Sequence, residues 1–486
     1  MNRVAELLKI NGPMLSGDLA RKYETAYGVS NDTARKAISR ARPPVNKLYK
    51  FKFNKNQMFY YLESQFMGDK YTDALLAAIK QHSKVIYTYI QAFIAQNGYV
   101  SKNILPAFTG APVGNVKGHK GYSDILNSLI QTGIIEELGE ERYMLSPSFY
   151  KLGKRNLGRS IGLETAKKII INDFDDWASK VNLVAYGKGK GLFDEPDFAQ
   201  FQWGYTAPSY IQPLYAEKEE QPGFVIADVF YGKTATKETV QFFIDKLNVI
   251  RSFRNISSLL PVLLVDKIDA DALHLLKKNK VMVAILSNFF TDKYTELLND
   301  LVNLFANATA IINKNPDALY ELFDALAKNE GRYNNMSGEL FELLVGSYFM
   351  HIGCTSLRSQ VIARDDESGR YKELDWLAER EGALVVVECK ATKAEIDEKF
   401  VRKWLNENIP FTRRWILDRF ANTKMEFQLW SVGGFTKKAL ELLRKAEEEN
   451  CKYCVKYFNR EQMLALAKDK NDKHFVQIMD KHFRRT

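Results

Sequence analysis

Three acidic side chains and one lysine near the C-terminus stand at spacings that could support phosphodiester chemistry. Glu342 lies in an apolar segment with helical periodicity, and Asp375 lies in a strand-like segment. Glu388 and Lys390 end the next strand-like segment. Burying a carboxylate is costly unless a cation compensates its charge. Carboxylate oxygens suit Mg²⁺, and an adjacent lysine can orient or deprotonate a water molecule bound to that ion.

The apolar pattern also predicts the elements that must position these side chains. It predicts one buried helix followed by three strands, over residues 338–349, 359–363, 371–378 and 383–390. Because successive strand residues point to opposite faces, Glu388 and Lys390 should share one face while Cys389 points to the other. A charged pair at the end of an otherwise apolar strand therefore indicates a site.

These motifs resemble those of the PD-(D/E)xK nuclease superfamily, and most of all its Mrr-type and Holliday-junction-resolvase-like branch. The resemblance covers about residues 332–465: Phe341-Glu342 on a helix, then Leu374-Asp375, twelve residues, and Glu388-Cys389-Lys390. It implies that Glu342, Asp375 and Glu388 bind the metal ion and that Lys390 is the catalytic, water-orienting lysine. It also implies Mg²⁺ as the cofactor, with Mn²⁺ as a substitute. Leu374 replaces the proline of the family motif, and Gln360 falls where some members place a supporting polar residue.

Positive charge is concentrated at the N-terminus. Residues 1–60 carry a net charge of +8, most of the surplus of +10 in the whole chain. Three short helices and a hairpin are predicted there, the pattern of a winged helix-turn-helix domain. The alternative is a solvated basic face on a protein-interaction domain. The residues expected to contact DNA are Asn31, Thr33, Arg35, Lys36, Ser39, Arg40 and Arg42 on the third helix, and Lys50 and Lys52 in the wing.

The chain as a whole is predicted to be a multidomain α/β plus α+β protein of four modules. Residues 1–66 and 67–158 are the two winged-helix domains, and the second should begin with one long helix over 71–96. Residues 159–315 form an α/β module that is either degenerate and nuclease-like or another structural domain, and 316–486 form a restriction-endonuclease-like domain with a mixed central sheet.

Two features of the α/β module bear on its function. Asp228 occupies the acidic position of a strand resembling that of Glu388, but Phe230 stands where a lysine is needed. We therefore favour a structural role over a second active site. Gly187-Lys-Gly-Lys-Gly191 has the composition of a phosphate-binding loop. It follows a predicted strand over 181–186 without entering a helix, so a flexible basic turn is the better interpretation.

Composition excludes several other classes. With 46% hydrophobic and 26% charged residues, the chain can bury several cores, and no run of about 18 apolar residues predicts a membrane span. Four cysteines cannot build a disulfide framework, which favours a reducing cytoplasm. Cys451 and Cys454 form a lone pair without the partners that a zinc site needs, so buried thiols are expected. No Walker A motif is present.

Together these features predict a sequence-specific, Mg²⁺-dependent DNA endonuclease. N-terminal DNA-recognition domains and a C-terminal nuclease domain resemble the architecture of type IIS restriction endonucleases, which implies a role in restriction-modification and phage defence. The expected partner is double-stranded DNA, bound by a monomer that pairs transiently to cut both strands. The alternatives are a modification-dependent or structure-specific nuclease acting on junctions or transposon ends, and a DNA-binding regulator with a relict nuclease domain.

Overall fold

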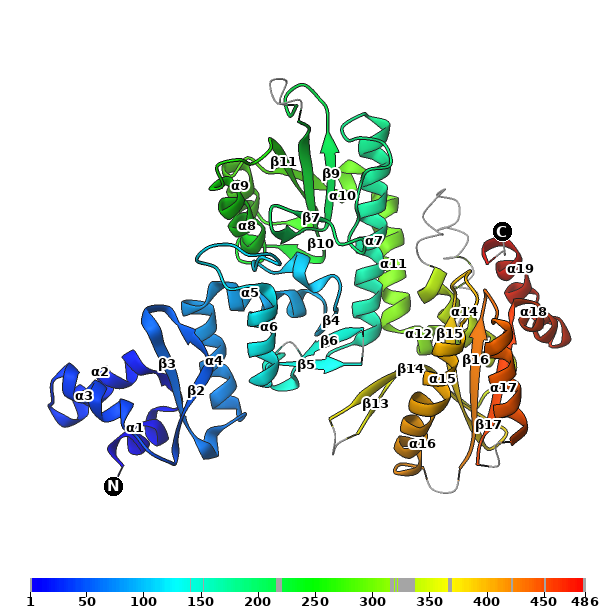
Figure 1. Cartoon of the computed structure of the whole chain (residues 1–486), viewed down its shortest axis with the longest axis horizontal. Coiled ribbons are helices and arrows are strands. Elements are labelled where there is room, and N and C mark those ends of the chain that lie inside the picture. The colour runs from blue at the N-terminus through cyan, green and yellow to red at the C-terminus, as the bar shows by residue number, and fades with distance from the viewer. Residues whose placement is uncertain are drawn as a thin grey trace. The chain divides into compact units, whose positions relative to one another are not determined.

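The computed structural model describes residues 2–139, 141–151, 153–215, 221–314, 319, 321, 337–365, 369–420, 423–449 and 452–483. They belong to two compact units, Met1–Glu137 with Glu141–Arg155 and Ala178–Ala284, and Leu138–Glu140 with Asn156–Trp177 and Ile285–Thr486. Helices and several sheets occur in both, so the chain is a mixed α/β multidomain protein (Figure 1). No helix in the described ranges has the length and apolarity needed to cross a bilayer.

The first unit begins with three helices and a small sheet. Their bounds are α1 Arg3–Asn11, β1 Met14–Leu15, α2 Ser16–Tyr27, α3 Asn31–Ser39, β2 Val45–Phe53, η1 Asn54–Asn56, β3 Gln57–Leu62 and η2 Glu63–Gln65. The strand order is β1-β3-β2. Ser30 caps α3, because its hydroxyl accepts a hydrogen bond from the N–H of Thr33 at 3.4 Å. The expected helices and hairpin are present, with β1 in addition, and the winged-helix assignment stays a prediction.

The next stretch does not begin with the single long helix that was expected over 71–96. It contains two helices, because Ser83 leaves the helical region with φ −145° and ψ 64° and interrupts the hydrogen-bond ladder. The elements here are α4 Asp69–His82, α5 Lys84–Ala95, β4 Tyr99–Ser101, η3 Leu105–Phe108, α6 Tyr122–Gln131, β5 Ile135–Leu138, β6 Arg142–Leu145 and η4 Pro147–Phe149. Its sheet has the order β4-β6-β5.

A four-stranded sheet completes the first unit in the order β12-β11-β10-β9. Its elements, with a separate two-stranded sheet of β7 and β8, are β7 Asp197–Phe198, β8 Phe201–Gln202, β9 Tyr205–Ser209, β10 Gly223–Ala235, α8 Gln241–Arg251, β11 Leu259–Ile268, α9 Ala270–Lys278 and β12 Met282–Ile285. β10 runs parallel to β11 and antiparallel to β9. The strand expected over 181–186 is wrong: these residues form turns after α7 (Leu157–Lys180) has ended.

A buried ion pair lies at the centre of this sheet. Asp228 on β10 and Lys246 on α8 are both fully buried, with 3.1 Å between Lys246 Nζ and Asp228 Oδ2. The same Nζ donates to the carbonyls of Ala107 and Gln202, at 2.6 and 3.0 Å. Asp228 Oδ1 also accepts from the N–H of Gly204. The ion pair therefore joins η3, the β8 strand, β10 and α8, and it serves as a structural link without contact to solvent.

The second unit is built around a five-stranded mixed sheet in the order β13-β14-β15-β16-β17. β14 is antiparallel to both of its neighbours, β13 and β15. β15, β16 and β17 are parallel to one another. The elements that follow α7 in this unit are α10 Leu286–Phe289, α11 Asp292–Ala306, α12 Ala308–Lys314, α14 Ser337–His351, β13 Ser356–Arg364, β14 Tyr371–Arg380, β15 Ala383–Lys390, α15 Glu398–Lys403, η6 Trp404–Asn408, α16 Ile409–Leu417, β16 Lys424–Ser431, α17 Lys437–Glu449, β17 Cys454–Asn459, α18 Arg460–Asp469 and α19 Lys473–His482.

Helices cover both faces of this sheet, as the C-terminal half of Figure 1 shows. On one face, apolar residues of α15, α16 and α17 pack against β15 and β16, for example Val401 and Leu443 in the same core as Val386. On the other face, the Trp430 ring contacts Tyr348 of α14 and Phe475 of α19. A π-helical turn, η6, separates α15 from α16. The start of the predicted 316–486 domain lies outside the described residues.

We expect the Asp228–Lys246 pair to be essential for the stability of the first unit. Replacing Lys246 with Ala leaves a buried carboxylate without its opposite charge, which should cost about 3–5 kcal/mol. Hydrogen exchange of the amides in β10 and α8 measures this loss as faster exchange. The double substitution Asp228→Asn with Lys246→Met should be less harmful than Lys246→Ala, and Lys277→Ala, at an exposed lysine of α9, should have no effect. Wild-type protection in Lys246→Ala would contradict a stabilising role.

Candidate active site

The candidate site begins where two neighbouring strands of the five-stranded sheet separate. β14 and β15 pair from Arg380 with Ala383 as far as Trp376 with Val387. Beyond this point β14 continues its pairing with β13, and β15 continues with β16. Asp375 and Glu388 are the first residues past the last pair, one on each strand. The sheet therefore opens at the two carboxylates that the sequence singles out.

The side chain of Asp375 bridges this opening. Its Oδ2 accepts a hydrogen bond from the main-chain N–H of Cys389 at 2.7 Å. On the other side, Gln360 of β13 interrupts the register between the pairs Ser359–Trp376 and Val361–Leu374, with a positive φ of 50°, and its Oε1 lies beside Gly158 of α7. A left-handed residue that is not glycine is strained, and such strain is often found at functional sites. The hydrogen bond and the irregular strand hold Asp375 at the mouth of the opening.

Glu388 is held by two lysines. Lys390 Nζ lies 2.9 Å from Glu388 Oε1, and Lys372 Nζ lies 3.1 Å from Glu388 Oε2. Burial alone would raise the pKa of Glu388, but Lys390 and Lys372 outweigh it and lower that pKa to about 2. Glu388 is therefore ionised throughout the physiological range. Lys372 is the second residue of β14, and its role at the site was not predicted from the sequence.

Lys390 keeps its positive charge in this environment. Burial by itself would lower the pKa of Lys390, but Glu388 and Asp375 raise it above its ordinary value. The ammonium also lies over the ring of Phe400 on α15, 5.6 Å from the centroid. A lysine that stays protonated can orient a water molecule or stabilise negative charge, but it is a poor general base. Of the two roles considered from the sequence, the structure favours orientation.

Glu342 approaches the site from α14. The Trp376 Nε1 donates to the main-chain carbonyl of Glu342 at 2.7 Å, which fastens the helix to β14. One turn later the helix passes so close to the same ring that a Cβ on Gly346 would lie 2.2 Å from it. Burial and the Asp375 carboxylate raise the pKa of Glu342 well above its usual range. Burial and Glu388 raise the pKa of Asp375 to about 7.

The donor set matches a hard divalent cation in its chemistry. It consists of carboxylate oxygens, and burial together with neighbouring carboxylates raises the pKa of Glu342 and of Asp375. Within the described parts of the chain, however, no three His, Cys, Asp or Glu side chains are arranged as a ready metal cluster. Both oxygens of Glu388 are engaged by lysines.

Two further acidic residues act on the site. Glu373 and Glu339 both act on the Glu342 carboxyl and raise its pKa further. Glu339 lies one turn before Glu342 on the same helix, as the sequence spacing indicates. Glu373 was not predicted, because its proximity depends on how α14 lies across β14. The cysteines are free: Cys354 and Cys389 are buried, but Cys454 is exposed. The expectation of a buried thiol is therefore wrong at Cys454, and Cys451 lies outside the described residues.

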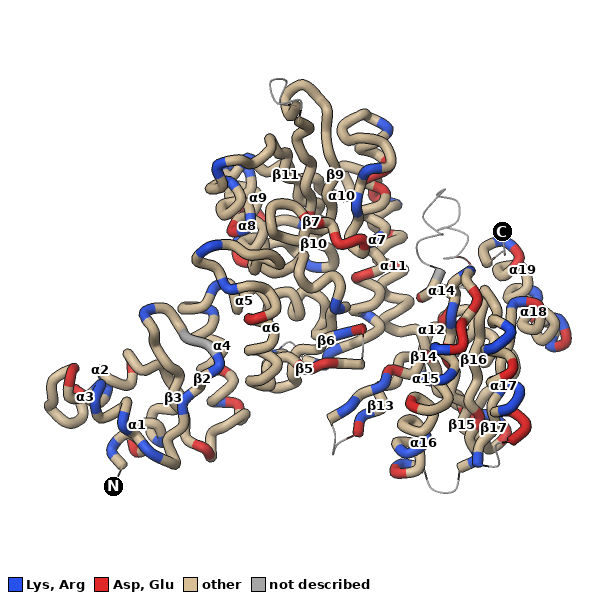
Figure 2. The backbone as a smooth tube through the Cα atoms, viewed as in Figure 1, with Lys and Arg blue, Asp and Glu red and all other residues tan. Residues whose placement is uncertain are grey.

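The residues predicted to contact DNA lie on the surface of the N-terminal helices and hairpin. α3 turns Ala34 and Ile38 into the core, and its polar side chains face solvent. Figure 2 marks the Lys and Arg residues of this module. The side chain of Lys52 lies outside what the structure describes, and whether this surface binds DNA stays a prediction. The exposed candidates are Asn31, Thr33, Arg35, Lys36, Ser39, Arg40, Arg42 and Lys50.

Comparison with known proteins adds little to this description. No family model and no curated protein matches the chain. A protein of unknown function, AF1548, is 17% identical to this chain, with a TM-score of 0.20. The match covers 26% of this chain and 64% of AF1548, so this chain spans less than two thirds of the length of AF1548. The restriction endonuclease FokI bound to DNA is 12% identical with a TM-score of 0.20, over 93% of this chain and 82% of FokI. Scores this low carry no conclusion about fold or function.

The raised pKa of Asp375 predicts how stability depends on pH in the absence of metal. The folded state holds the Asp375 proton more tightly than the unfolded state, so this contribution to stability is complete below pH 4 and is lost as the pH rises toward about 7. We expect Asp375→Asn to raise the free energy of unfolding of the second unit by about 1–3 kcal/mol at pH 8 and to have little effect at pH 4.

Tryptophan fluorescence can follow this change in EDTA, since five of the six tryptophans, Trp177, Trp376, Trp404, Trp415 and Trp430, lie in the second unit. Glu379→Gln, at an exposed carboxylate of the same strand, is the control and should change nothing at either pH. An Asp375→Asn protein that is destabilised equally at pH 4 and pH 8 would show that the carboxylate is structural.

Proposed function

We propose that this chain is a Mg²⁺-dependent DNA endonuclease, whose second unit hydrolyses phosphodiester bonds. The observation that supports the proposal is the convergence of Glu342, Asp375, Glu388 and Lys390 at the point where β14 and β15 separate. Carboxylates buried together at an open strand end are costly, and the local charge is left negative despite two lysines. That arrangement suits a site that binds a divalent cation and a phosphate.

The residues have distinct roles in the proposed reaction. Glu388 and Asp375 would hold the metal ion from two strands, and Glu342 would add a carboxylate from α14. Lys390, which stays protonated, hydrogen-bonds the attacking water and faces the negative charge that develops on the phosphate. When bound, Mg²⁺ would supply positive charge to the reacting oxygens and lower the pKa of the attacking water. In-line attack breaks the bond between phosphorus and the 3′-oxygen and leaves a 3′-hydroxyl and a 5′-phosphate.

Recognition is assigned to the first unit. α3 exposes an arginine, a lysine and an asparagine in nine residues, with Arg40 directly after it, and such side chains hydrogen-bond base edges in the major groove. DNA recognition by one unit and hydrolysis by the other give a sequence-specific enzyme of the type IIS kind, with a role in restriction. With one catalytic site per chain, cutting both strands requires two copies to meet transiently.

A structure-specific or modification-dependent nuclease is the second candidate. The same four site residues support it equally, because they determine hydrolysis and not the choice of DNA. A regulator with a relict nuclease domain is less well supported, since Glu388 and Lys390 remain paired and Asp375 remains fixed. Cleavage of unmodified plasmid at one sequence distinguishes the first candidate from the second.

Replacing Lys390 should abolish cleavage. We expect Lys390→Ala to cut plasmid DNA about 100-fold more slowly or worse in Mg²⁺, because it removes the charge that faces the reacting phosphate. Binding to the same DNA should persist. Lys424→Ala, at an exposed lysine that begins β16, is the matched control and should cut normally. Cleavage by Lys390→Ala at the wild-type rate, or cleavage by the native protein in EDTA, would refute the assignment.

Replacing Arg35 should weaken recognition without affecting the catalytic site. We expect Arg35→Ala in the full chain to bind its target DNA more weakly by about 1–3 kcal/mol, if the guanidinium contacts a guanine in a bidentate manner. Affinity should also fall steeply with salt, because phosphate contacts release counterions. A gel-shift titration measures both effects. Arg251→Ala, at an exposed arginine that ends α8, should bind normally; equal weakening in both variants would exclude α3 as the recognition helix.

A further inference from the structure

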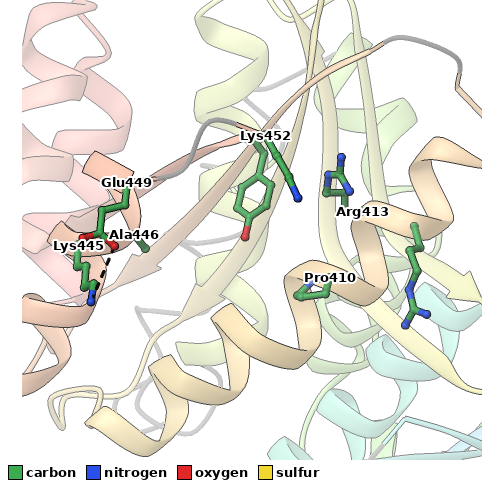
Figure 3. A pocket seen from close by; sticks show the side chains of 8 residues that line it. Pro410, Arg413, Lys445, Ala446, Glu449 and Lys452 are labelled. Atoms are coloured by element: carbon green, nitrogen blue, oxygen red, sulfur yellow. Dashed lines mark ion pairs between the residues drawn. The ribbon is translucent and has the colours of Figure 1, made fainter.

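A second concave site lies in the second unit, at the opposite end of the sheet from the catalytic residues. It is a cavity of about 700 Å³ between α16, the last turn of α17 and the residues just before β17. Figure 3 shows side chains from these elements around it. The lining residues are Pro410, Arg413, Arg414, Lys445, Ala446, Glu449, Lys452 and Tyr453.

The position of the cavity separates it from the proposed active site. β15, β16 and β17 are parallel, and the catalytic Lys390 ends β15 at their carboxyl ends. Tyr453 immediately precedes β17, whose first residue aligns through β16 with Val385 of β15. Five residues of strand therefore lie between the two levels, which is about 17 Å. The cavity and the catalytic residues are therefore separate, and no side chain belongs to both.

The charge of the cavity favours an anion. Four of the lining side chains are cationic and one is a carboxylate. That carboxylate, Glu449, lies 3.9 Å from Lys445 in a solvent-exposed pair, so it offsets little of the positive charge. Arg413 and Arg414 bring guanidinium groups, which match the oxygens of a phosphate.

The remaining lining residues point to more than an inorganic ion. Tyr453 packs its ring in a T-shaped contact on Phe427, 5.2 Å between centroids, at the border of the cavity. Pro410 and Ala446 add apolar surface beside it. A volume of this size is typical of sites for small organic ligands and is much larger than one phosphate group. Aromatic and apolar surface next to cations suits a flat base joined to phosphates.

We propose that this cavity binds a nucleoside phosphate, with Arg413, Arg414 and Lys445 at the phosphates and Tyr453 beside the base. The proposal does not depend on the nuclease activity, because the cavity and the catalytic residues share no side chain. It gives the second unit a site for a small anionic ligand in addition to the site for DNA.

Calorimetric titration of the full-length protein with ATP, in EDTA and 150 mM salt, tests the proposal. We expect ATP to bind and Arg414→Glu and Lys445→Glu to weaken binding at least about tenfold, because each reverses a charge that faces the phosphates. Lys438→Glu is the matched control: it makes the same charge change two turns earlier on α17, at an exposed lysine outside the cavity. It should bind ATP like the wild type, and both reversed variants should retain the wild-type circular dichroism spectrum.

Three results would overturn the proposal. They are absence of ATP binding at millimolar concentration, equal weakening by Lys438→Glu, and displacement of ATP by a short DNA duplex. The last would show that the cavity contacts the phosphates of DNA. Inorganic phosphate that binds as tightly as ATP would likewise exclude a role for Tyr453 and the base. None of these results changes with the outcome of the cleavage test on Lys390→Ala.

Discussion

The balance of charge around Glu388 is the constraint on which the rest of the second unit depends. A buried carboxylate at the end of a strand is tolerated only with compensating cations, and here Lys372 and Lys390 supply them from two strands. Next to this cluster, β14 and β15 part after Trp376 and Val387. Asp375 then satisfies the N–H of Cys389 that the separation frees. α14 completes the site, fixed by the Trp376 hydrogen bond and by the lack of a Cβ at Gly346.

Much of this arrangement could be predicted from the sequence, because it follows from local periodicity. Strand alternation places Glu388 and Lys390 on one face, and the structure brings their charged atoms to 2.9 Å. What sequence reasoning missed depends on contacts between elements. Lys372 contacts Glu388 because β14 lies beside β15 in the sheet. The spacing of Lys372 from Asp375 along the sequence does not predict this contact. Ser83 interrupts an otherwise continuous helical pattern, and the turns over 181–186 follow from where α7 ends. Propensity alone does not fix such points.

Asp228 and Asp375 show why one carboxylate on a strand is structural and another is a candidate for catalysis. Both residues occupy similar positions in apolar strands. Because Phe230 stands two residues after Asp228, the sequence favoured a structural role for this carboxylate. In the structure, the cation beside Asp228 is Lys246 of α8. That pair is one charge against one, fully buried and enclosed by hydrogen bonds to Ala107 and Gln202. At the candidate site three carboxylates, those of Glu342, Asp375 and Glu388, stand against two lysines. The surplus of negative charge, and not the motif, separates the two cases.

That surplus links stability to function in the second unit. Without a cation, Glu342 and Asp375 can share the site only by retaining protons, which is why burial and mutual repulsion raise both pKa values. A divalent ion that binds only the folded chain removes this repulsion and stabilises the fold by mass action. In the proposed function, an ion held by Glu388 would share the oxygens of this carboxylate with Lys372 and Lys390. The proposed function therefore couples metal binding to the stability of the second unit through the same carboxylates.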